Sequence, residues 1–274
     1  MRFSKYHALG NDYIMLDSRD THLEVTPQLV RRLCDRHYGI GSDGVLLGPL
    51  PSTDCDFGLR FFNPDGSVFE KSGNGLRIFA RYLWDAGLVQ SDPFSVRTPG
   101  GVVRCQIHPG GNEVSVEMGL ISFHSHAIPV VGPEREVLNE TLDLDGVAFR
   151  YCAATIGNPH CVLIRDEVSE AEARRWGPLI EVNGRFPNRT NVQFVQILDP
   201  ASIRIEIWER GAGYTLASGS SSCAAAAVAH RLGYCGPEVT VRMPGGELSV
   251  SLSAQYAATL TGPVSRVYEG EISI

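Results

Sequence analysis

The sequence predicts an α+β fold of two pseudo-symmetric domains, each a mixed or antiparallel sheet curved around a central helix. Three observations lead to this prediction. Several landmark motifs occur twice, in the same order and at nearly the same spacing. Apolar and polar residues alternate in many short segments, such as "VSVEM" and "SIRIEIW", as they do in half-buried strands. The two most helix-like segments follow Ser72 and Ser218, one in each half of the chain.

The repeated landmarks are a Gly-Asn pair, a serine before a helix-like segment, a glycine after it and a Pro-Gly-Gly turn. Gly10 precedes Ser72 by 62 residues, and Gly157 precedes Ser218 by 61. A glycine, the residue favoured after a helix C-terminus, follows 15 residues after each serine. The turns stand in "SVRTPGG" and "TVRMPGG". These spacings indicate two homologous domains of about 120 residues each. A duplication that left no functional symmetry is the alternative.

The composition is that of a globular protein with a core, and it excludes several classes. Of 274 residues, 43% are hydrophobic and 20% charged, with a formal net charge of −7. This charge argues against nucleic acid or an anionic membrane as a partner. No apolar run reaches the ~18 residues of a membrane helix, and no secretion signal is recognisable. Seven cysteines without a C-x-x-C pair predict a cytoplasmic protein with neither a disulfide framework nor a metal site.

One motif, "GIGSDG" at residues 39–44, has the glycine spacing of a dinucleotide-binding loop. That fingerprint requires a strand before it and a helix after it. Here a charged, helix-like segment precedes the motif, and the short, proline-terminated "VLLGPLP" follows. We therefore interpret it as a tight loop between a helix and a strand. No other pattern indicates a cofactor, so we expect none: no nucleotide, pyridoxal phosphate or metal.

Ser72 and Ser218 stand at predicted helix N-termini, in "SGNG" and "SGSSS". The first N–H groups of a helix carry partial positive charge and attract carboxylates, and glycine allows close approach. Two such N-termini facing one cleft would hold a substrate carboxylate and place one serine on each side of the neighbouring carbon. Racemisation needs one group to remove a proton from one face and another to return a proton to the opposite face. For either serine alone, a simple helix cap is the competing interpretation.

Seven longer motifs extend over essentially the whole chain, to about Gly262: "YHALGNDYIMLD", "RHYGIGSDG", "FFNPDGS", "SGNGLRIFARYL", "IGNPHCV", "FPNRTNVQFV" and "ERGAGYTLASGSSSCAAAAVA". They resemble the motifs of the diaminopimelate epimerase family. The resemblance implies domains of residues 1–119 with 263–274 and of residues 120–262, the last strand returning to the first domain. It also implies a cofactor-independent, two-base epimerase of LL- and meso-diaminopimelate in lysine biosynthesis. We further expect a homodimer, the commonest oligomer of soluble enzymes.

The resemblance also assigns a site to this chain. Ser72 and Ser218 occupy the positions of the two catalytic cysteines, and His160 matches a histidine that assists proton transfer; a structural histidine is the alternative. The residues that match those around the non-reacting centre are Asn63, Asn158, Asn191, Glu209 and Arg210. Those that match the reacting centre are Asn11, Gly73, Asn74, Gly219 and Ser220. Arg210 would take the distal carboxylate and Glu209 the ammonium group.

The serines are the main departure from the family pattern. A thiol has a pKa near 8.5, lowered further at a helix N-terminus, whereas a serine hydroxyl is a far weaker acid that needs an activating base. Tyr214 stands where the family has Glu, and Ser220 and Ser221 replace Thr and Gly. Three hypotheses therefore stay open: an epimerase that works with serines, a catalytically impaired amino-acid-binding homologue, and an isomerase of another substrate. The serine pair reflects either natural divergence or a deliberate substitution that traps substrate.

Overall fold

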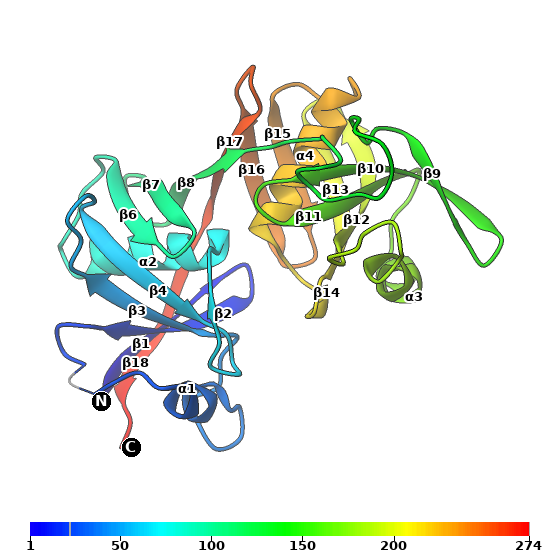
Figure 1. Cartoon of the computed structure of the whole chain (residues 1–274). Helices are drawn as coiled ribbons and strands as arrows, with labels where there is room; N and C mark the ends of the chain where they lie inside the picture. Colours follow the sequence, from blue (N-terminus) through cyan, green and yellow to red (C-terminus); the bar gives the residue numbers. More distant parts are fainter. Residues whose placement is uncertain (22, 274) are drawn as a thin grey trace. The chain divides into compact units, whose positions relative to one another are not determined.

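The computed structural model describes residues 1–21 and 23–273. The chain divides into two compact units: unit 1 is Met1–Glu117 with Thr261–Ile274, and unit 2 is Met118–Leu260. Strands of mixed direction and two helices make up each unit, so the α+β class predicted from the sequence is confirmed (Figure 1). Among the described residues, no helix is long and apolar enough to span a membrane.

The described residues of unit 1 form nine strands and two helices, which follow one another along the chain apart from the last strand, near the C-terminus. They are β1 (Arg2–Ala8), β2 (Asn11–Asp17), α1 (Pro27–Cys34), β3 (Val45–Leu50), β4 (Phe57–Phe62), β5 (Val68–Phe69), α2 (Gly73–Asp85), β6 (Phe94–Thr98), β7 (Gly101–Ile107), β8 (Glu113–Leu120) and β18 (Ser265–Glu271). β1 pairs antiparallel with both β2 and β18. The β2–β3 and β4–β6 pairs are parallel, and the β3–β4, β6–β7 and β7–β8 pairs are antiparallel. The last strand thus completes the sheet that the first begins.

Unit 2 has an equivalent set of elements. They are β9 (Glu140–Leu144), β10 (Val147–Thr155), β11 (Pro159–Arg165), α3 (Glu170–Glu181), β12 (Asn191–Asp199), β13 (Ser202–Glu209), β14 (Gly213–Thr215), α4 (Gly219–Arg231), β15 (Glu238–Met243), β16 (Gly246–Leu252) and β17 (Ala257–Pro263). The β11–β12 and β13–β15 pairs are parallel, and the β10–β11, β12–β13 and β15–β16 pairs are antiparallel. The boundaries between the units fall inside β8 and β17.

The pairing pattern is the same in both units, which confirms the pseudo-symmetry predicted from the repeated motifs. An antiparallel hairpin comes first, β1–β2 in unit 1 and β10–β11 in unit 2. A parallel connection through α1 or α3 follows, then an antiparallel pair, then a second parallel connection through α2 or α4. An antiparallel hairpin with a Pro-Gly-Gly turn comes next. The sequence repeat therefore corresponds to a repeat of topology.

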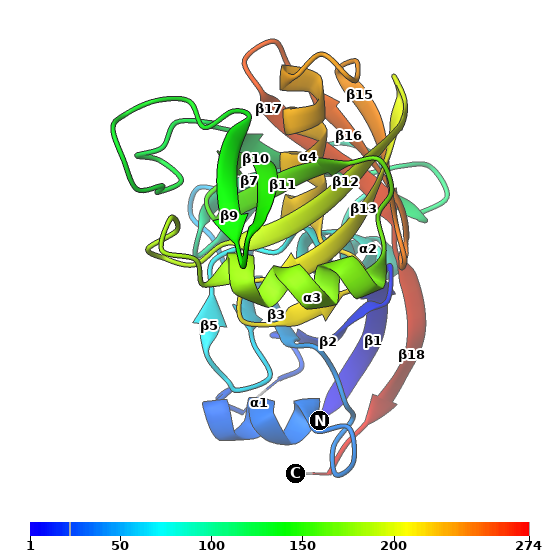
Figure 2. The same cartoon turned by 90° about the vertical axis from the view of Figure 1, so that its right-hand side faces the viewer.

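The central helices α2 and α4 each have 13 residues and pack against the sheet of their own unit (Figure 2). α4 contacts β10, β11, β12, β13, β15 and β16, and nearly all of its residues are buried. Its alanines explain this burial, because a helix with small apolar side chains all round can be enclosed by strands. Each helix is followed by a glycine in the left-handed region, Gly87 at φ 69° and Gly233 at φ 80°, where a Cβ would be strained.

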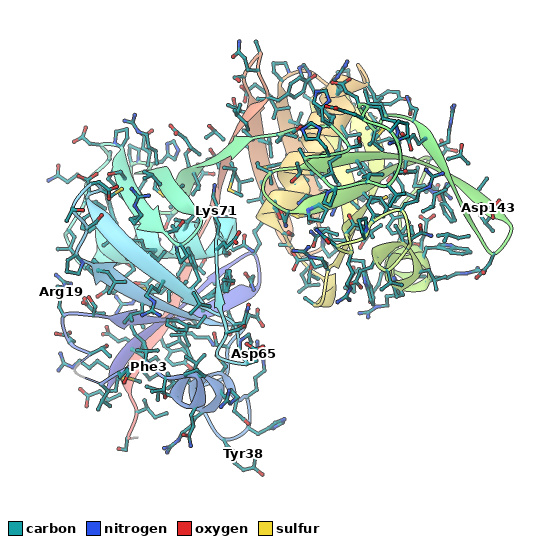
Figure 3. All side chains as sticks on the ribbon, viewed as in Figure 1. Phe3, Arg19, Tyr38, Asp65, Lys71 and Asp143 are labelled. Atoms are coloured by element: carbon teal, nitrogen blue, oxygen red, sulfur yellow. The ribbon has the colours of Figure 1, made fainter. Side chains whose placement is uncertain are left out.

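The "GIGSDG" motif lies in the loop between α1 and β3, so its interpretation as a helix-to-strand loop is confirmed. The loop folds back on the helix end: the N–H groups of Ile40 and Gly41 both donate to the carbonyl oxygen of Leu33 at 3.0 Å. Tyr38 protrudes from this loop with 90% of its surface exposed (Figure 3). No strand precedes the motif and no helix follows it, so the dinucleotide-binding geometry is missing from this described segment.

Candidate active site

The structure places Ser72 and Ser218 at the N-caps of α2 and α4 with nearly identical backbone geometry. Their φ and ψ angles are −139° and 122° for Ser72, and −146° and 124° for Ser218. Both are extended conformations, so the first N–H groups of each helix are left for side chains or a ligand. The two half-sites, each formed by one unit, therefore begin with the same local structure.

The two serine hydroxyls differ in what they bind. Ser72 Oγ accepts a hydrogen bond from the N–H of Gly75 at 3.0 Å, which is an ordinary helix cap. Ser218 is buried and makes no side-chain cap hydrogen bond. Instead, Ser222 Oγ donates to the carbonyl oxygen of Ser218 at 2.8 Å. The Ser218 hydroxyl is thus not engaged in capping α4, and a purely capping role does not account for it.

In unit 1, two of the residues assigned to the reacting centre contact each other at the N-terminus of α2. Asn74 Nδ2 donates to Asn11 Oδ1 at 3.0 Å. Asn74 follows Gly73 in the first turn of the helix, so both asparagines belong to the same half-site as Ser72. Asn63, which the family resemblance assigns to the non-reacting centre, follows β4, and its Nδ2 donates to Ser67 Oγ at 2.9 Å.

In unit 2, Asn191 holds the backbone at Arg210. Its Oδ1 accepts from the N–H of Arg210 at 3.0 Å, and its Nδ2 donates to the carbonyl oxygen of Pro159 at 2.9 Å. The guanidinium of Arg210 is exposed and donates through Nη1 to the carbonyl oxygen of Asn188 at 3.1 Å. Since a guanidinium has five donors, further N–H groups are available for a carboxylate. Asn191 therefore fixes the turn that follows Glu209, at the end of β13.

Sequence reasoning missed Glu181, a buried carboxylate that supports the same turn. Its oxygens accept from Trp208 Nε1 at 2.7 Å and from the N–H of Gly211 at 2.8 Å, and it pairs with Arg189. The turn that carries Arg210 is therefore held from one side by Asn191 and from the other by Glu181. No sequence signal identifies it, because all three partners lie eight or more residues away along the chain.

His160 is fully buried and hydrogen-bonded to another site residue. Its Nε2 lies 3.0 Å from Asn158 Oδ1, and Asn158 Nδ2 donates to Ser220 Oγ at 3.4 Å. Burial lowers the pKa of His160 to about 3; hydrogen bonding with the Gln193 side chain opposes this, and the charge of Arg210 adds to it. The imidazole is therefore neutral at pH 7, and its Nε2–H donates to Asn158. The neutral imidazole orients the side chains of Asn158 and Ser220. It carries no positive charge at pH 7 and therefore does not act as a cationic proton donor.

Gln193 and Ser221 form a second buried contact at the start of α4 that the sequence did not reveal. Both are fully buried, and Gln193 Nε2 donates to Ser221 Oγ at 3.0 Å. Ser221 is one of the departures from the family pattern, and the hydrogen bond explains how a hydroxyl is accommodated at this buried position. It ties β12 to the first turn of the helix that Ser218 caps.

Tyr214, another departure from the family pattern, takes on structural contacts. Tyr214 donates from its hydroxyl to Glu206 Oε2 at 2.6 Å, and the guanidinium carbon of Arg174 lies 4.5 Å from its ring centroid. Burial and the Glu206 carboxylate raise the pKa of Tyr214.

Cys161, next to His160 in sequence, is fully buried, and burial raises the pKa of its thiol well above the ordinary value. Its thiol is therefore protonated and is not a substitute for the missing thiolate.

The described residues contain no group of three or more His, Cys, Asp or Glu side chains arranged to hold a metal ion.

The first half-site comprises Asn11, Ser72, Gly73 and Asn74, and the second comprises Asn158, His160, Asn191, Glu209, Arg210, Ser218, Gly219 and Ser220. Each combines a polarised helix N-terminus with asparagine amides, which suits an amino-acid carboxylate.

Solved structures with this fold include a racemase, an epimerase and phenazine biosynthesis proteins. A probable proline racemase from Agrobacterium radiobacter superposes with a TM-score of 0.71 at 17% identity, covering 100% of this chain and 93% of the other. A hydroxyproline epimerase from Agrobacterium vitis gives a TM-score of 0.70 at 15% identity, covering 98% and 91%. At this identity the likeness establishes the fold alone.

Sequence comparison identifies the family. The family model described as diaminopimelate epimerase matches residues 3–124 and 152–267. "Diaminopimelate epimerase 2" from a Nostoc species is 55% identical over 273 residues, covering 100% of this chain and 96% of the relative. Diaminopimelate epimerase from Pelotomaculum thermopropionicum is 40% identical, covering 99% and 98%. The chain belongs to the diaminopimelate epimerase family, a family of isomerases, and the family predicted from its motifs is confirmed.

Proposed function

We propose that this protein is a cofactor-independent amino-acid epimerase that interconverts LL- and meso-diaminopimelate in lysine biosynthesis. The observation that carries the proposal is the pair of helix N-termini with matching backbone geometry, each beginning at a serine. In the proposed reaction, one of these positions removes the α-proton and the other returns a proton to the opposite face. The polarised N–H groups stabilise the negative charge that develops on the substrate carboxylate.

Substrate recognition is supported by the turn at Glu209 and Arg210. A diaminopimelate molecule carries a second carboxylate and a second ammonium group at its non-reacting end, and this turn offers one charge of each sign. Asn191 and Glu181 fix the backbone of the turn, so the guanidinium starts from a defined position. Pre-ordering of this kind reduces the entropy lost on binding.

Serine at both positions makes slow proton transfer the expected behaviour. Neither hydroxyl is hydrogen-bonded to an imidazole or carboxylate within residues 1–21 and 23–273, so nothing there activates it as a base. General acid–base catalysis contributes about 10²–10⁴-fold, and the protein is expected to lose much of that factor. Binding and carboxylate stabilisation remain, and these support residual turnover.

The same observation favours a second candidate, an amino-acid-binding homologue without turnover. The two candidates are separated by incubating the protein with LL-diaminopimelate in D₂O and following both stereochemistry and deuterium at the α-carbon. The epimerase predicts meso product with deuterium at the inverted centre, formed slowly. Tight binding by calorimetry with no deuterium incorporated would establish the binding homologue. Neither binding nor exchange would refute the assignment of substrate.

Location and assembly are part of the proposal. We place the protein in the cytoplasm, because cysteines buried without disulfides, such as Cys34 and Cys105, are typical of proteins from reducing compartments. We propose a homodimer, since closed dimers are the commonest assemblies of soluble enzymes. Sedimentation equilibrium tests it: a mass near 30 kDa at micromolar concentration would contradict the dimer, given a chain of 29.9 kDa.

A further inference from the structure

The motif at residues 39–44 plays no part in the function proposed so far, yet its aspartate contacts the half-site of unit 1. Asp43 Oδ2 accepts from Asn11 Nδ2 at 2.9 Å and from the N–H of Asp12 at 3.1 Å. Asp43 Oδ1 accepts from Arg36 Nη2 at 2.7 Å. The carboxylate thus has one oxygen toward a surface cation and one toward the first residues of β2.

The hydrogen bonds continue from Asn11 into the central helix. Asn11 Oδ1 accepts from Asn74 Nδ2 at 3.0 Å, and Asn74 Oδ1 accepts from Arg77 Nη2 at 2.9 Å. Asn74 is 5% exposed and Arg77 is fully buried. We call this series from Asp43 through Asn11 and Asn74 to Arg77 the amide relay.

The two ends of the amide relay determine how its amides are turned. An ionised carboxylate only accepts hydrogen bonds, and a guanidinium only donates them. If the Asn11 amide were rotated by about 180°, its oxygen would face the Asp43 carboxylate, and two acceptors would meet. If the Asn74 amide were rotated in the same way, its Nδ2 would face the Arg77 guanidinium, and two donors would meet. Both Nδ2 groups therefore point toward the Asp43 end. Each Nδ2 uses one N–H in the relay and keeps a second one.

We propose that Asp43 is a positioning residue for substrate binding: it turns the Asn11 and Asn74 amides so that they offer N–H donors, and not oxygens, beside the N-terminus of α2. The ligand class is an amino-acid α-carboxylate. The proposal rests on the proposed function, because that function assigns both asparagines to the reacting centre. It adds a role for the 39–44 motif that neither its glycine spacing nor its loop position explains.

Hydrogen bonds hold the loop at residues 39–44 in place, so that Asp43 can orient the Asn11 amide. The carbonyl oxygens of Asp12 and Gly44, at 2.9 and 2.7 Å from Ser42 Oγ, share the one hydroxyl proton of Ser42. The N–H of Asp43 donates to the carbonyl oxygen of Asp12 at 3.0 Å. The buried ammonium of Lys5 binds both the Asp12 carboxylate and the carbonyl oxygen of Gly41. These contacts hold the backbone on both sides of Asp43 against the start of β2.

The amide relay and simple electrostatics predict changes of opposite sign. Asp43 is a negative charge near a site for an anion, so Coulomb repulsion alone predicts tighter carboxylate binding when that charge is removed. The relay predicts weaker binding, because freed amides can turn their oxygens toward the carboxylate. The direction of the change therefore distinguishes an orienting role from a bystander charge.

The first experiment measures the Kd of diaminopimelate by calorimetry for Asp43→Ala, Asp43→Asn and the control Asp54→Asn. Asp54 also pairs with an arginine on the surface of unit 1, Arg97, but has no contact with the relay. We expect about tenfold weaker binding for Asp43→Ala, the size of one lost hydrogen bond to a charged group. Asp43→Asn keeps an acceptor oxygen, so about two- to threefold is expected, and the control should bind as the unmodified protein does.

Binding that is unchanged or tighter in both Asp43 variants, with melting temperatures near that of the unmodified protein, would overturn the proposal. Asp43→Asn keeps the side-chain shape and tests the idea if the alanine variant does not fold.

A second measurement separates failure of this inference from failure of the proposed function. Side-chain amide hydrogen exchange, followed by NMR on the ligand-free protein, should show protected Nδ2 protons at Asn11 and Asn74 that lose protection in the Asp43 variants. Equal exchange in all proteins would overturn the relay, even if diaminopimelate binds. If diaminopimelate does not bind but the protection depends on Asp43, the substrate assignment fails and the orienting role of Asp43 stands.

Discussion

The burial of His160 predicts a specific dependence of stability on pH. The folded pKa of about 3 lies below the value near 6.5 of an unfolded histidine. The contribution of this neutral histidine is therefore fully present above about pH 6.5 and is lost as the pH falls toward 3. Between pH 7 and pH 5 the unfolded histidine takes up most of a proton and the folded one almost none. The free energy of unfolding should fall by about 2 kcal/mol from this residue alone.

The test compares urea unfolding of the unmodified protein and of His160→Gln at pH 7 and pH 5. Trp176 and Trp208 report on unit 2, and a Trp84→Phe background removes the tryptophan of unit 1. The glutamine does not titrate, so its variant should lose about 2 kcal/mol less over this interval. Equal losses in His160→Gln and the unmodified protein would refute the neutral, buried state.

Two further predictions concern the elements that hold the half-sites. Ser72→Ala should lower the free energy of unfolding of unit 1 by about 1 kcal/mol, because it removes the hydrogen bond that caps the N–H of Gly75. Ser218→Ala should lower the free energy of unfolding of unit 2 far less, since no cap hydrogen bond is lost. Equal losses in chemical unfolding would contradict the assigned geometry. Glu181→Gln should destabilise unit 2 by about 1–3 kcal/mol and weaken diaminopimelate binding, because one amide oxygen replaces two acceptors that hold the turn of Arg210. Amide exchange at Gly211 should accelerate, and unchanged exchange there would show that Glu181 does not restrain the turn.

The repeat made the fold predictable from the sequence. Two serine-initiated helices of equal length, each followed by a glycine and a Pro-Gly-Gly turn, are local features that remain visible without any tertiary information. In the structure, both helices begin at these serines, and the φ and ψ angles of Ser72 and Ser218 are nearly the same. Of the two helices that precede the central ones, α1 was recognised as a charged, helix-like segment, and α3 was not identified from the sequence. α3 contains Pro178 within its length, and the charged α1 is only eight residues long.

The contacts that orient the site were outside the reach of sequence patterns. Asp43, Glu181 and Gln193 act through partners that lie from 7 to 32 residues away. Asp43 and Gln193 stand in recognised motifs, but the motifs do not say which groups these side chains contact. The family motifs marked Asn191 as a ligand-binding residue, and the structure adds that its amide also hydrogen-bonds to the backbone at Arg210 and Pro159. Such contacts depend on the folded chain and leave no pattern in the sequence.

The most direct measurement for the central claim is α-proton exchange by the double variant Ser72→Cys/Ser218→Cys. With diaminopimelate in D₂O, thiols at both helix N-termini should raise the rate of deuterium incorporation at least about a hundredfold over the unmodified protein. Ser169→Cys, which changes the N-cap serine of α3, is the matched control and should have no effect. A double variant that exchanges no faster than the unmodified protein would contradict the account, because the two N-termini would then not be the acid and base positions of this fold.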